Sequence, residues 1–311
     1  MKSAVSKSVY DESIGYTFVR TLSSPLLRPA VIRCVASIVW HFFFRQYRAA
    51  LLPGRVPVTR VDHPLDVKIP FRPSWAAVYL DFAAFWVRML AFLLRTYDRR
   101  ASGAARKFIV SMGELYVFAA EIYRNNFSTT NRPFYIARPR FFLIHLVDPH
   151  LMCIPSLHVM VVIRTYTQFA AILRTFGDTQ RFAAQIEEMK QGALAITQAI
   201  LFVKQHSVNC IAAALYAMTC VDAELFPPEE AEAFTGLLFG EPPLAPAGPG
   251  SKTNAAVRPH SAPRTRLPEG DIAEIKAHIL GLYFRFLSER KTAKRWDEPL
   301  LNFLRPLPRK H

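Results

Sequence analysis

Two histidines lie in short polar strings that interrupt long apolar stretches of the 311-residue sequence. His158 ends the tetrapeptide Pro-Ser-Leu-His at 155–158, and His206 follows a lysine and a glutamine 48 residues later. An imidazole can attack phosphorus as a nucleophile, or it can pass a proton to a leaving oxygen near neutral pH. If the two rings converge, one could attack phosphorus while the other protonates the departing group.

A run of cations precedes the first of these strings. The segment 124–140 has no acidic residue and holds four arginines, Arg124, Arg132, Arg138 and Arg140. A guanidinium group neutralises phosphate oxygens and can bind two of them at once, and Lys204 and Ser156 would add donors beside the histidines. These residue types predict a site for a phosphate ester. In the alternative interpretation the arginines anchor lipid headgroups, and each histidine is an ordinary residue at a helix end.

The acidic residues and the thiols leave more than one interpretation open. Glu114 and Glu121 lie seven residues apart on one face of an apolar segment, and acids within a membrane usually face the interior of a bundle. They could support a catalytic histidine, or they could pair with Arg88 or Arg164. No cluster has the ligand spacing of a metal site, so we expect neither a metal nor another cofactor. The four cysteines form neither a disulfide framework nor a zinc pattern.

The elements that must position these residues are both apolar and basic. Hydrophobic residues make up 51% of the chain, the mean hydropathy is +0.13 and the net charge is +15, a composition too apolar for an intrinsically disordered chain. The basic residues flank apolar runs and do not form one stripe, so a membrane and a lipid phosphate substrate are the expected partners, not nucleic acid. Six runs approach the length of a spanning helix, and these are Pro29–Phe44, Trp75–Leu94, Lys107–Tyr123, Cys153–Leu173, Gly192–Val203 and Val208–Val221.

These runs predict an all-α fold, a polytopic six-helix membrane bundle, and a large soluble helical core is the alternative. The connection 95–107 carries five basic residues against one acid, which favours a cytoplasmic location for that loop. We therefore expect an integral protein of the cytoplasmic (inner) membrane, with both termini in the cytoplasm and the two histidines on the opposite face. The connection 45–72 is also basic and argues against this orientation.

The sequence divides into four regions. Residues 1–28 form a basic N-terminal segment, and 29–223 form the predicted membrane domain. Residues 224–268 include a proline-rich stretch and are expected to be a flexible, disordered linker on the cytoplasmic side. Residues 269–311 contain an amphipathic helix followed by a basic tail. The helix could pack on the bundle or on a partner, or it could lie on the membrane surface.

The Pro-Ser-Leu-His string and His206 resemble two motifs of the type 2 phosphatidic acid phosphatase (PAP2) superfamily, whose members are integral membrane phosphatases and phosphotransferases. That family carries K-x6-R-P, P-S-G-H and S-R-x5-H-x3-D on a six-helix bundle. Arg132-Pro133 matches the end of the first motif, and the resemblance covers roughly residues 75 to 221. The leucine at 157 and the Lys-Gln before His206 are similar to the branch related to inositol phosphorylceramide synthases.

The match departs from the family pattern at named positions. Asn125 stands at the lysine of the first motif, Ala199 and Ile200 replace the Ser-Arg of the third, and Cys210 takes the place of its aspartate. The family aspartate accepts a hydrogen bond from the nucleophilic histidine and holds the attacking tautomer. A neutral thiol is a poor acceptor, so Cys210 is the motif position that most affects catalysis.

The resemblance implies roles for the remaining residues. His206 would form a phosphohistidine, His158 would protonate the leaving alkoxide, and Arg132 would hold the phosphate. Ser156 would donate to a phosphate oxygen, and Arg138, Arg140 or Lys204 would assist. The expected function is a lipid phosphatase or phosphotransferase, and the alternative is a catalytically inactive PAP2-like membrane protein that retains a phosphate-binding pocket.

Overall fold

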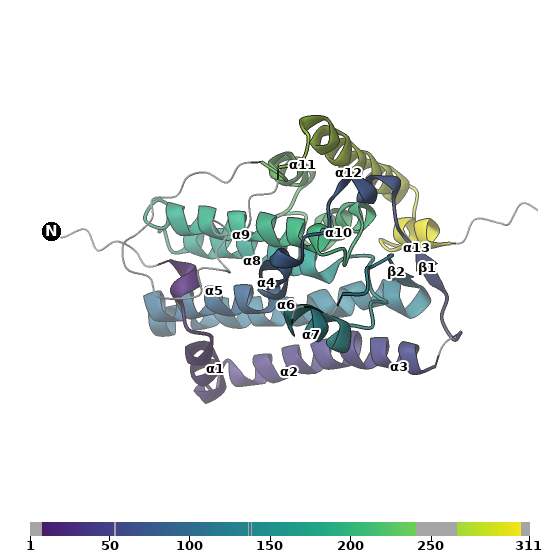
Figure 1. Ribbon diagram of the computed structural model, residues 1–311. Coiled ribbons are helices and arrows are strands. Elements are labelled where there is room, and N and C mark those ends of the chain that lie inside the picture. Colours follow the sequence, from purple (N-terminus) through teal and green to yellow (C-terminus); the bar gives the residue numbers. More distant parts are fainter. Residues whose placement is uncertain (1–7, 53, 136, 138, 241–265, 306–311) are drawn as a thin grey trace, which may run out of the picture.

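The computed structural model describes residues 8–52, 54–135, 137, 139–240 and 266–305. These residues are mostly helical, which confirms the predicted all-α class. Helices cover the six apolar runs, and most of them lie side by side along one direction (Figure 1). The predicted segments at 1–7 and 241–265 and the end of the basic tail at 306–311 lie outside the described residues.

The N-terminal part forms a long bent arm along one edge of the molecule. Short α1 meets the rest of the arm at an angle of 117°, and α2 continues through a π-helical turn, η2, into α3 (Figure 1). The proline after Arg28 starts α2, as expected for a residue that lacks an N–H and has a helical φ. The arm consists of α1 (Ile14–Ser23), α2 (Arg28–Ile38), η2 (Val39–Phe44) and α3 (Arg45–Leu51).

Two helical hairpins form the centre of the molecule. Tyr97, at the end of α5, donates a hydrogen bond of 2.5 Å to Asp178 in the turn between α8 and α9. The turns of both hairpins therefore lie at the same end, and the start of α8 and the end of α9 lie away from them. The central helices are α4 (Ala76–Leu80), α5 (Phe82–Tyr97), α6 (Ser102–Asn125), α8 (Leu157–Thr175), α9 (Ala183–Phe202) and α10 (Val208–Val221). Most side chains of α8 and nearly all of those of α10 are buried.

At the end of the molecule away from the hairpin turns, short elements hold three connecting loops together. β1 (Val58–Arg60) pairs in parallel with β2 (Phe127–Thr129), and Ser128 of β2 forms a bridge with Met152. The loops after α3, after α6 and before α8 are thereby held together. Further short elements are η1 (Val9–Asp11), η3 (Pro64–Lys68), η4 (Pro73–Trp75), η5 (Asp98–Ala101) and α7 (Pro139–Val147).

The C-terminal helices cover α10. Within the predicted linker 224–268, the structure has a helix, α11 (Pro228–Leu237), so this part of the linker prediction is wrong. α12 (Glu269–Arg290) buries Ile275, Ile279 and Phe286, and its Tyr283 hydroxyl lies 2.9 Å from that of Thr219 on α10. The amphipathic helix thus packs on the bundle, as one of the two interpretations predicted, and α13 (Glu298–Leu304) follows it.

Within the described residues, one helical stretch is long and apolar enough to cross a membrane. It runs from Pro73 to Asn125 through α5 and α6, and 67% of its most apolar window is buried inside the protein. A second stretch also meets this requirement if α1 and the rest of the arm are taken together as one bent span. A mostly buried helix of this kind also occurs in the core of soluble proteins. The structure therefore shows one or two apolar helices, which weakly suggest an association with a membrane, and the described residues do not show six spans.

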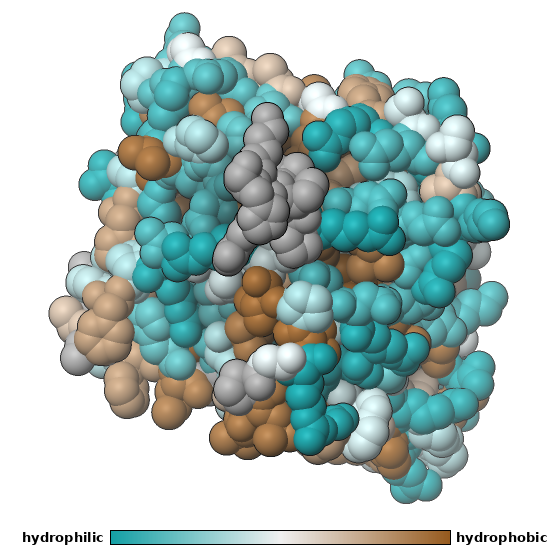
Figure 2. All heavy atoms as spheres, turned by 90° about the vertical axis from the view of Figure 1, so that its right-hand side faces the viewer, coloured by the Kyte–Doolittle hydropathy of each residue, from teal (hydrophilic) through white to brown (hydrophobic). Residues whose placement is uncertain are grey.

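Large apolar side chains are exposed mainly on the arm and on α7. Figure 2 shows the molecule from the right-hand side of Figure 1, with apolar side chains gathered in the lower part of that face and hydrophilic ones over most of the upper part. The exposed residues of the arm are Phe18, Val19, Leu22, Leu26, Ile32, Val35, Val39, Trp40, Phe44, Tyr47, Leu51 and Leu52. Large apolar side chains exposed along one element are typical of a contact with lipid or with another protein.

Candidate functional site

The structure brings His158 and His206 into contact, although 48 residues separate them. Nε2 of His206 lies 3.3 Å from Nδ1 of His158, and the ring planes cross at 67° with centroids 5.3 Å apart. The distance allows one ring to donate a hydrogen bond to the other. Both side chains are buried, and Tyr79 and Phe82 pack against the His158 ring.

Helix ends fix both histidines. His158 lies in the first turn of α8, directly after a loop that contains the cis Ile154–Pro155 peptide bond. His206 lies between α9 and α10, where Lys204 adopts a left-handed φ of 56° and the His206 amide donates to the carbonyl oxygen of Ile200 at 3.2 Å. A residue with positive φ after a helix allows this type of closing hydrogen bond. Ser207 then caps α10 through its hydroxyl.

A third histidine, His150, belongs to the same group of rings. Its centroid lies 6.3 Å from that of His206, and Thr130 Oγ1 lies 2.8 Å from its Nε2. Burial, together with nearby His206 and Arg132, lowers the pKa of His150 to about 2, so the ring is neutral. No motif surrounds His150 in the sequence, so its place in this group was not predicted. Its position five residues before Pro155 was the only available signal.

The rings line a small cavity. Its volume is about 10 Å³, near the lower limit for one water molecule. Phe42 and Gln46 of the arm form part of its wall, and Ser156 Oγ lies 3.5 Å from Nε2 of His206. Gln46 accepts a hydrogen bond from the Leu151 amide at 2.9 Å, while its Nε2 is buried and has no partner within the described residues. Gln46 was not predicted, because its position on the arm is distant in sequence.

Arg132 lies at the rim of this group and does not contact the histidine rings. It donates to Gln205 Oε1 and to the carbonyl oxygen of Asp148, both at 3.1 Å. Gln205 directly precedes His206, and Asp148 lines the cavity and accepts from the His150 amide at 2.8 Å. Arg132 therefore connects the two loops that carry His150 and His206.

The other predicted cations do not gather here. Lys204 donates to the carbonyl oxygen of Asp66, on the η3 segment, because its left-handed backbone turns the side chain toward that element. Arg140 is exposed on α7, and Arg124, at the end of α6, lines a different pocket with Arg45. Arg138 lies outside the described residues. The prediction of one cluster of arginines and lysine beside the histidines is therefore wrong for Lys204, Arg140 and Arg124.

The two carboxylates proposed as support for His206 lie elsewhere. Glu121 accepts from the Trp296 indole at 3.0 Å and lies 3.6 Å from Arg295. Glu114 is exposed, and its charge acts on Arg164, which forms an ion pair of 2.6 Å with Asp222. Because α6 turns this face toward the C-terminal helices, neither acid reaches the histidines.

Cys210 instead lies beside His206. It is in the first turn of α10, and its sulfur accepts a hydrogen bond from the Ser207 amide at 3.4 Å. The two side chains interact, while Nδ1 of His206 is buried without a hydrogen-bond partner of its own in the described chain. The N-terminal turn of a helix and a backbone N–H both favour a thiolate over a thiol. Cys210 thus lies beside the histidine that the predicted motif would pair with an aspartate.

Within the residues that the structure describes, no group of three or more His, Cys, Asp or Glu side chains is arranged to hold a metal ion. In the comparisons with known proteins, no family model, no curated protein and no solved structure matches this chain significantly.

Proposed function

We propose that this protein is a membrane-associated phosphatase or phosphotransferase that acts on a phosphate-bearing lipid through a phosphohistidine on His206. The observation that carries the proposal is the 3.3 Å contact between Nε2 of His206 and Nδ1 of His158. A nucleophile and a general acid must lie within hydrogen-bond reach of one another or of a shared group. The resemblance to the PAP2 superfamily in the residues 155–158 and at His206 supports the same assignment.

The reaction proceeds in two displacements. Nε2 of His206 attacks phosphorus, the bond to the alkoxide oxygen breaks, and a protonated His158 transfers its proton to that oxygen. In the second displacement His158, now neutral, takes a proton from water or from an alcohol, whose oxygen attacks phosphorus as the nitrogen–phosphorus bond breaks. With a lipid phosphomonoester, water gives free phosphate and a lipid alcohol gives a new lipid phosphomonoester. With a phosphodiester lipid, the phosphohistidine carries the headgroup, and a lipid alcohol receives the phospho-headgroup.

Neutral donors surround the position of the phosphate. Ser156 lies 3.5 Å from the attacking nitrogen, and the unpartnered Nε2 of Gln46 is available in the cavity wall. The guanidinium group of Arg132 supplies positive charge at the rim of the cavity, where its hydrogen bond to Gln205 holds it. Because the cavity holds about 10 Å³, the arm residues Phe42 and Gln46 must move to admit a phosphate. The π-helical turn that carries Phe42 suits this role, since such turns often occur at functional sites.

The membrane part of the proposal rests on the apolar surface of the arm and on the apolar stretch that contains α5 and α6. In this proposal the arm contributes one span, the two central hairpins contribute four, and α10 contributes the sixth. The basic connection between α5 and α6 then faces the cytoplasm, with the histidine cavity on the opposite face.

The test is product formation from a lipid phosphomonoester by the purified full-length protein in nonionic detergent. Free phosphate is measured with and without an added lipid alcohol for the wild type, for His206→Ala and for a control. The control is His63→Ala, which removes a histidine that stacks on His278 and does not line the cavity. We expect turnover in the wild type and the control and none in His206→Ala. Suppression of phosphate release by the alcohol, with a new lipid product, would identify a transferase. Equal background rates in all three proteins would reject the enzyme and leave the inactive phosphate-binding alternative.

A further inference from the structure

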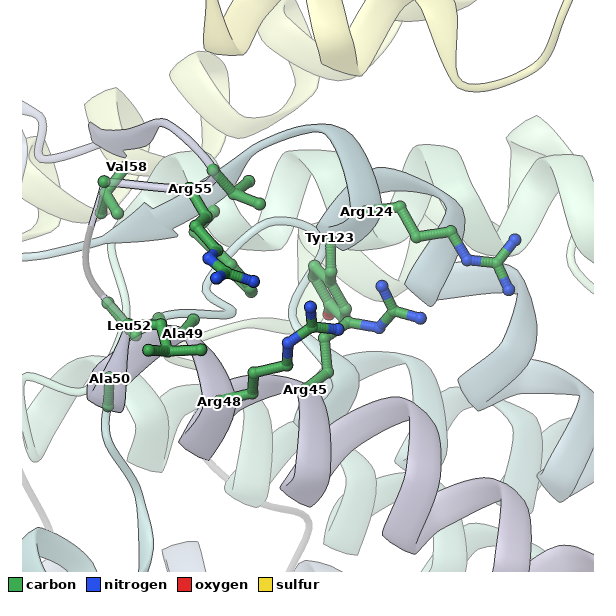
Figure 3. Close-up of a pocket in the computed structure, with 13 residues that line it drawn as sticks. Arg45, Arg48, Ala49, Ala50, Leu52, Arg55, Val58, Tyr123 and Arg124 are labelled. Carbon is green, nitrogen blue, oxygen red and sulfur yellow. The ribbon is translucent and has the colours of Figure 1, made fainter.

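A second pocket lies where the end of the arm meets the end of α6. Its volume is about 480 Å³, within the range of small-ligand sites. Arg45 and Arg48 project from α3, Arg124 from α6, and Arg55 from the loop that follows the arm. Figure 3 shows Arg45 and Arg48 extending beside Tyr123, with Arg55 reaching down from the loop on another side.

The charges of this pocket are not balanced by any residue that the structure describes. Its lining contains four guanidinium groups and no carboxylate, and none of the four forms an ion pair within the described chain. Nε of Arg45 is buried without a hydrogen-bond partner there, and its charge interacts with those of Arg48 and Arg124. Like charges held this close repel one another. A bound anion would remove the repulsion and satisfy the buried donor.

The shape and the lining point to a particular class of anion. Guanidinium groups bind phosphate oxygens in a bidentate geometry. The remaining wall is apolar, with Leu52, Val58 and Phe127, and the exposed side chains of Tyr47 and Leu51 lie on the same helix as Arg45 and Arg48. A phosphate group attached to an apolar chain, or a free phosphate, fits this mixture.

We propose that this arginine pocket is a binding site for a phosphate group, carried either by a phospholipid headgroup or by a soluble phosphate. It is separate from the histidine cavity and contains no nucleophile or general base, because its lining has no His, Cys, Ser, Asp or Glu side chain. The pocket therefore binds and does not catalyse. The proposal does not depend on the activity of His206.

The pocket nevertheless adjoins the histidine cavity. Tyr123 lines the pocket, and its hydroxyl donates at 2.6 Å to the carbonyl oxygen of Pro155, next to Ser156. Arg45 and Gln46 are neighbours in α3, and the first lines the pocket while the second lines the cavity. A phosphate held by Arg45 would thus fix the part of the arm that covers the histidines.

The experiment measures binding of two probes to the full-length protein in nonionic detergent by titration calorimetry. Inorganic pyrophosphate represents the soluble source, and a short-chain phosphatidic acid represents the lipid source. The test variant is R48Q/R124Q, and the control R99Q/R106Q removes the same charge at exposed positions near the other end of α6. All four arginines are exposed, and thermal melting confirms the fold of each variant. His206→Ala separates this pocket from the histidine cavity.

We expect the wild type, the control and His206→Ala to bind alike. The R48Q/R124Q variant should bind roughly thirty-fold more weakly, from about 1 kcal/mol for each basic residue next to an anionic headgroup. Tighter binding of the lipid than of pyrophosphate identifies a phospholipid headgroup, and the reverse identifies a soluble phosphate. The proposal is overturned if the wild type binds neither probe, if R99Q/R106Q loses as much affinity as R48Q/R124Q, or if only His206→Ala loses binding.

Discussion

The histidine cavity and the arginine pocket lie on two sides of α3 and are lined by different kinds of side chain. The cavity measures about 10 Å³ and joins three imidazoles to neutral donors, with one arginine at its rim. The pocket is larger, at about 480 Å³, and joins four guanidinium groups to apolar side chains. Imidazoles can exchange protons and form covalent bonds near neutral pH, whereas guanidinium groups remain protonated. Titratable imidazoles and fixed positive charges are therefore separated in this molecule, although α3 contributes to both sites.

Replacement of His158 by alanine should give the largest loss. We expect product formation to fall about 10²–10⁴-fold, the usual contribution of a general acid or base, because the variant lacks the imidazole that protonates the leaving oxygen. Binding of phosphate probes at the arginine pocket should not change. Steady-state rates and calorimetry on the same preparation measure both. A variant that loses both properties would show that the two sites are not independent.

Replacement of Arg132 by glutamine should give the next largest effect. The variant loses the contacts to Gln205 and to the Asp148 carbonyl, and the loop that carries His206 becomes less fixed. We expect kcat/KM to fall about 10–100-fold, as for loss of a residue that orients a reactive group. Arg140→Gln is the matched control, because Arg140 is exposed on α7. An equal loss in Arg140→Gln would contradict the position assigned to Arg132.

Replacement of Cys210 by aspartate should increase activity. A carboxylate at this position can accept a hydrogen bond from Nδ1 of His206, which is buried without one among the described residues. We expect a gain of about tenfold in kcat, well below the ~10⁴ that an orienting carboxylate contributes elsewhere, because the pocket is shaped for sulfur. Cys220→Asp, at the other end of α10, serves as the control. A lower rate in Cys210→Asp with an intact fold would show that the thiol itself is required.

Acidification should destabilise the cavity through His150. Its folded-state pKa, about 2, lies below the ordinary value of 6.5, so the unfolded chain binds the proton first as the pH falls. The free energy of unfolding should therefore be unaffected above pH 6.5 and decrease below it, by up to about 1.4 kcal/mol for each pH unit. Denaturant titrations at several pH values measure the slope. His150→Gln should reduce that slope, and an unchanged slope would contradict the buried, neutral state of this ring.

The helices were more predictable than the site, and the reason is physical. Each of the six apolar runs is helical in the structure, because the apolar pattern and the helix ends are encoded locally. Six spans through a membrane do not follow from this, since one or two apolar stretches meet the requirement by length and composition. Pro155, Ser156 and His206 could be selected from the sequence because they lie at two predicted helix ends, with a spacing that resembles the PAP2 motifs.

Residues that reach the site through tertiary contacts could not be predicted. Gln46 arrives on the arm, and His150 is placed by the pairing of Ser128 with Met152. Arg124 and Arg132 appear as one cluster in the sequence, but the end of α6 directs the first toward Arg45 and the loop directs the second toward Gln205. Cys210 stands at the position of the motif aspartate, and its contact with His206 could not be predicted without knowing where α10 starts.

The most direct test of the central claim is to look for phosphate bound covalently to His206. The protein is mixed with a lipid phosphomonoester, quenched in base, in which phosphohistidine survives, and analysed by peptide mass spectrometry. We predict a phosphoryl group on His206 in the wild type, a larger amount in His158→Ala with a substrate whose leaving group needs no proton, and none in His206→Ala. Turnover by the wild type without any modification of His206, or the same modification at a histidine outside the cavity, would contradict the account.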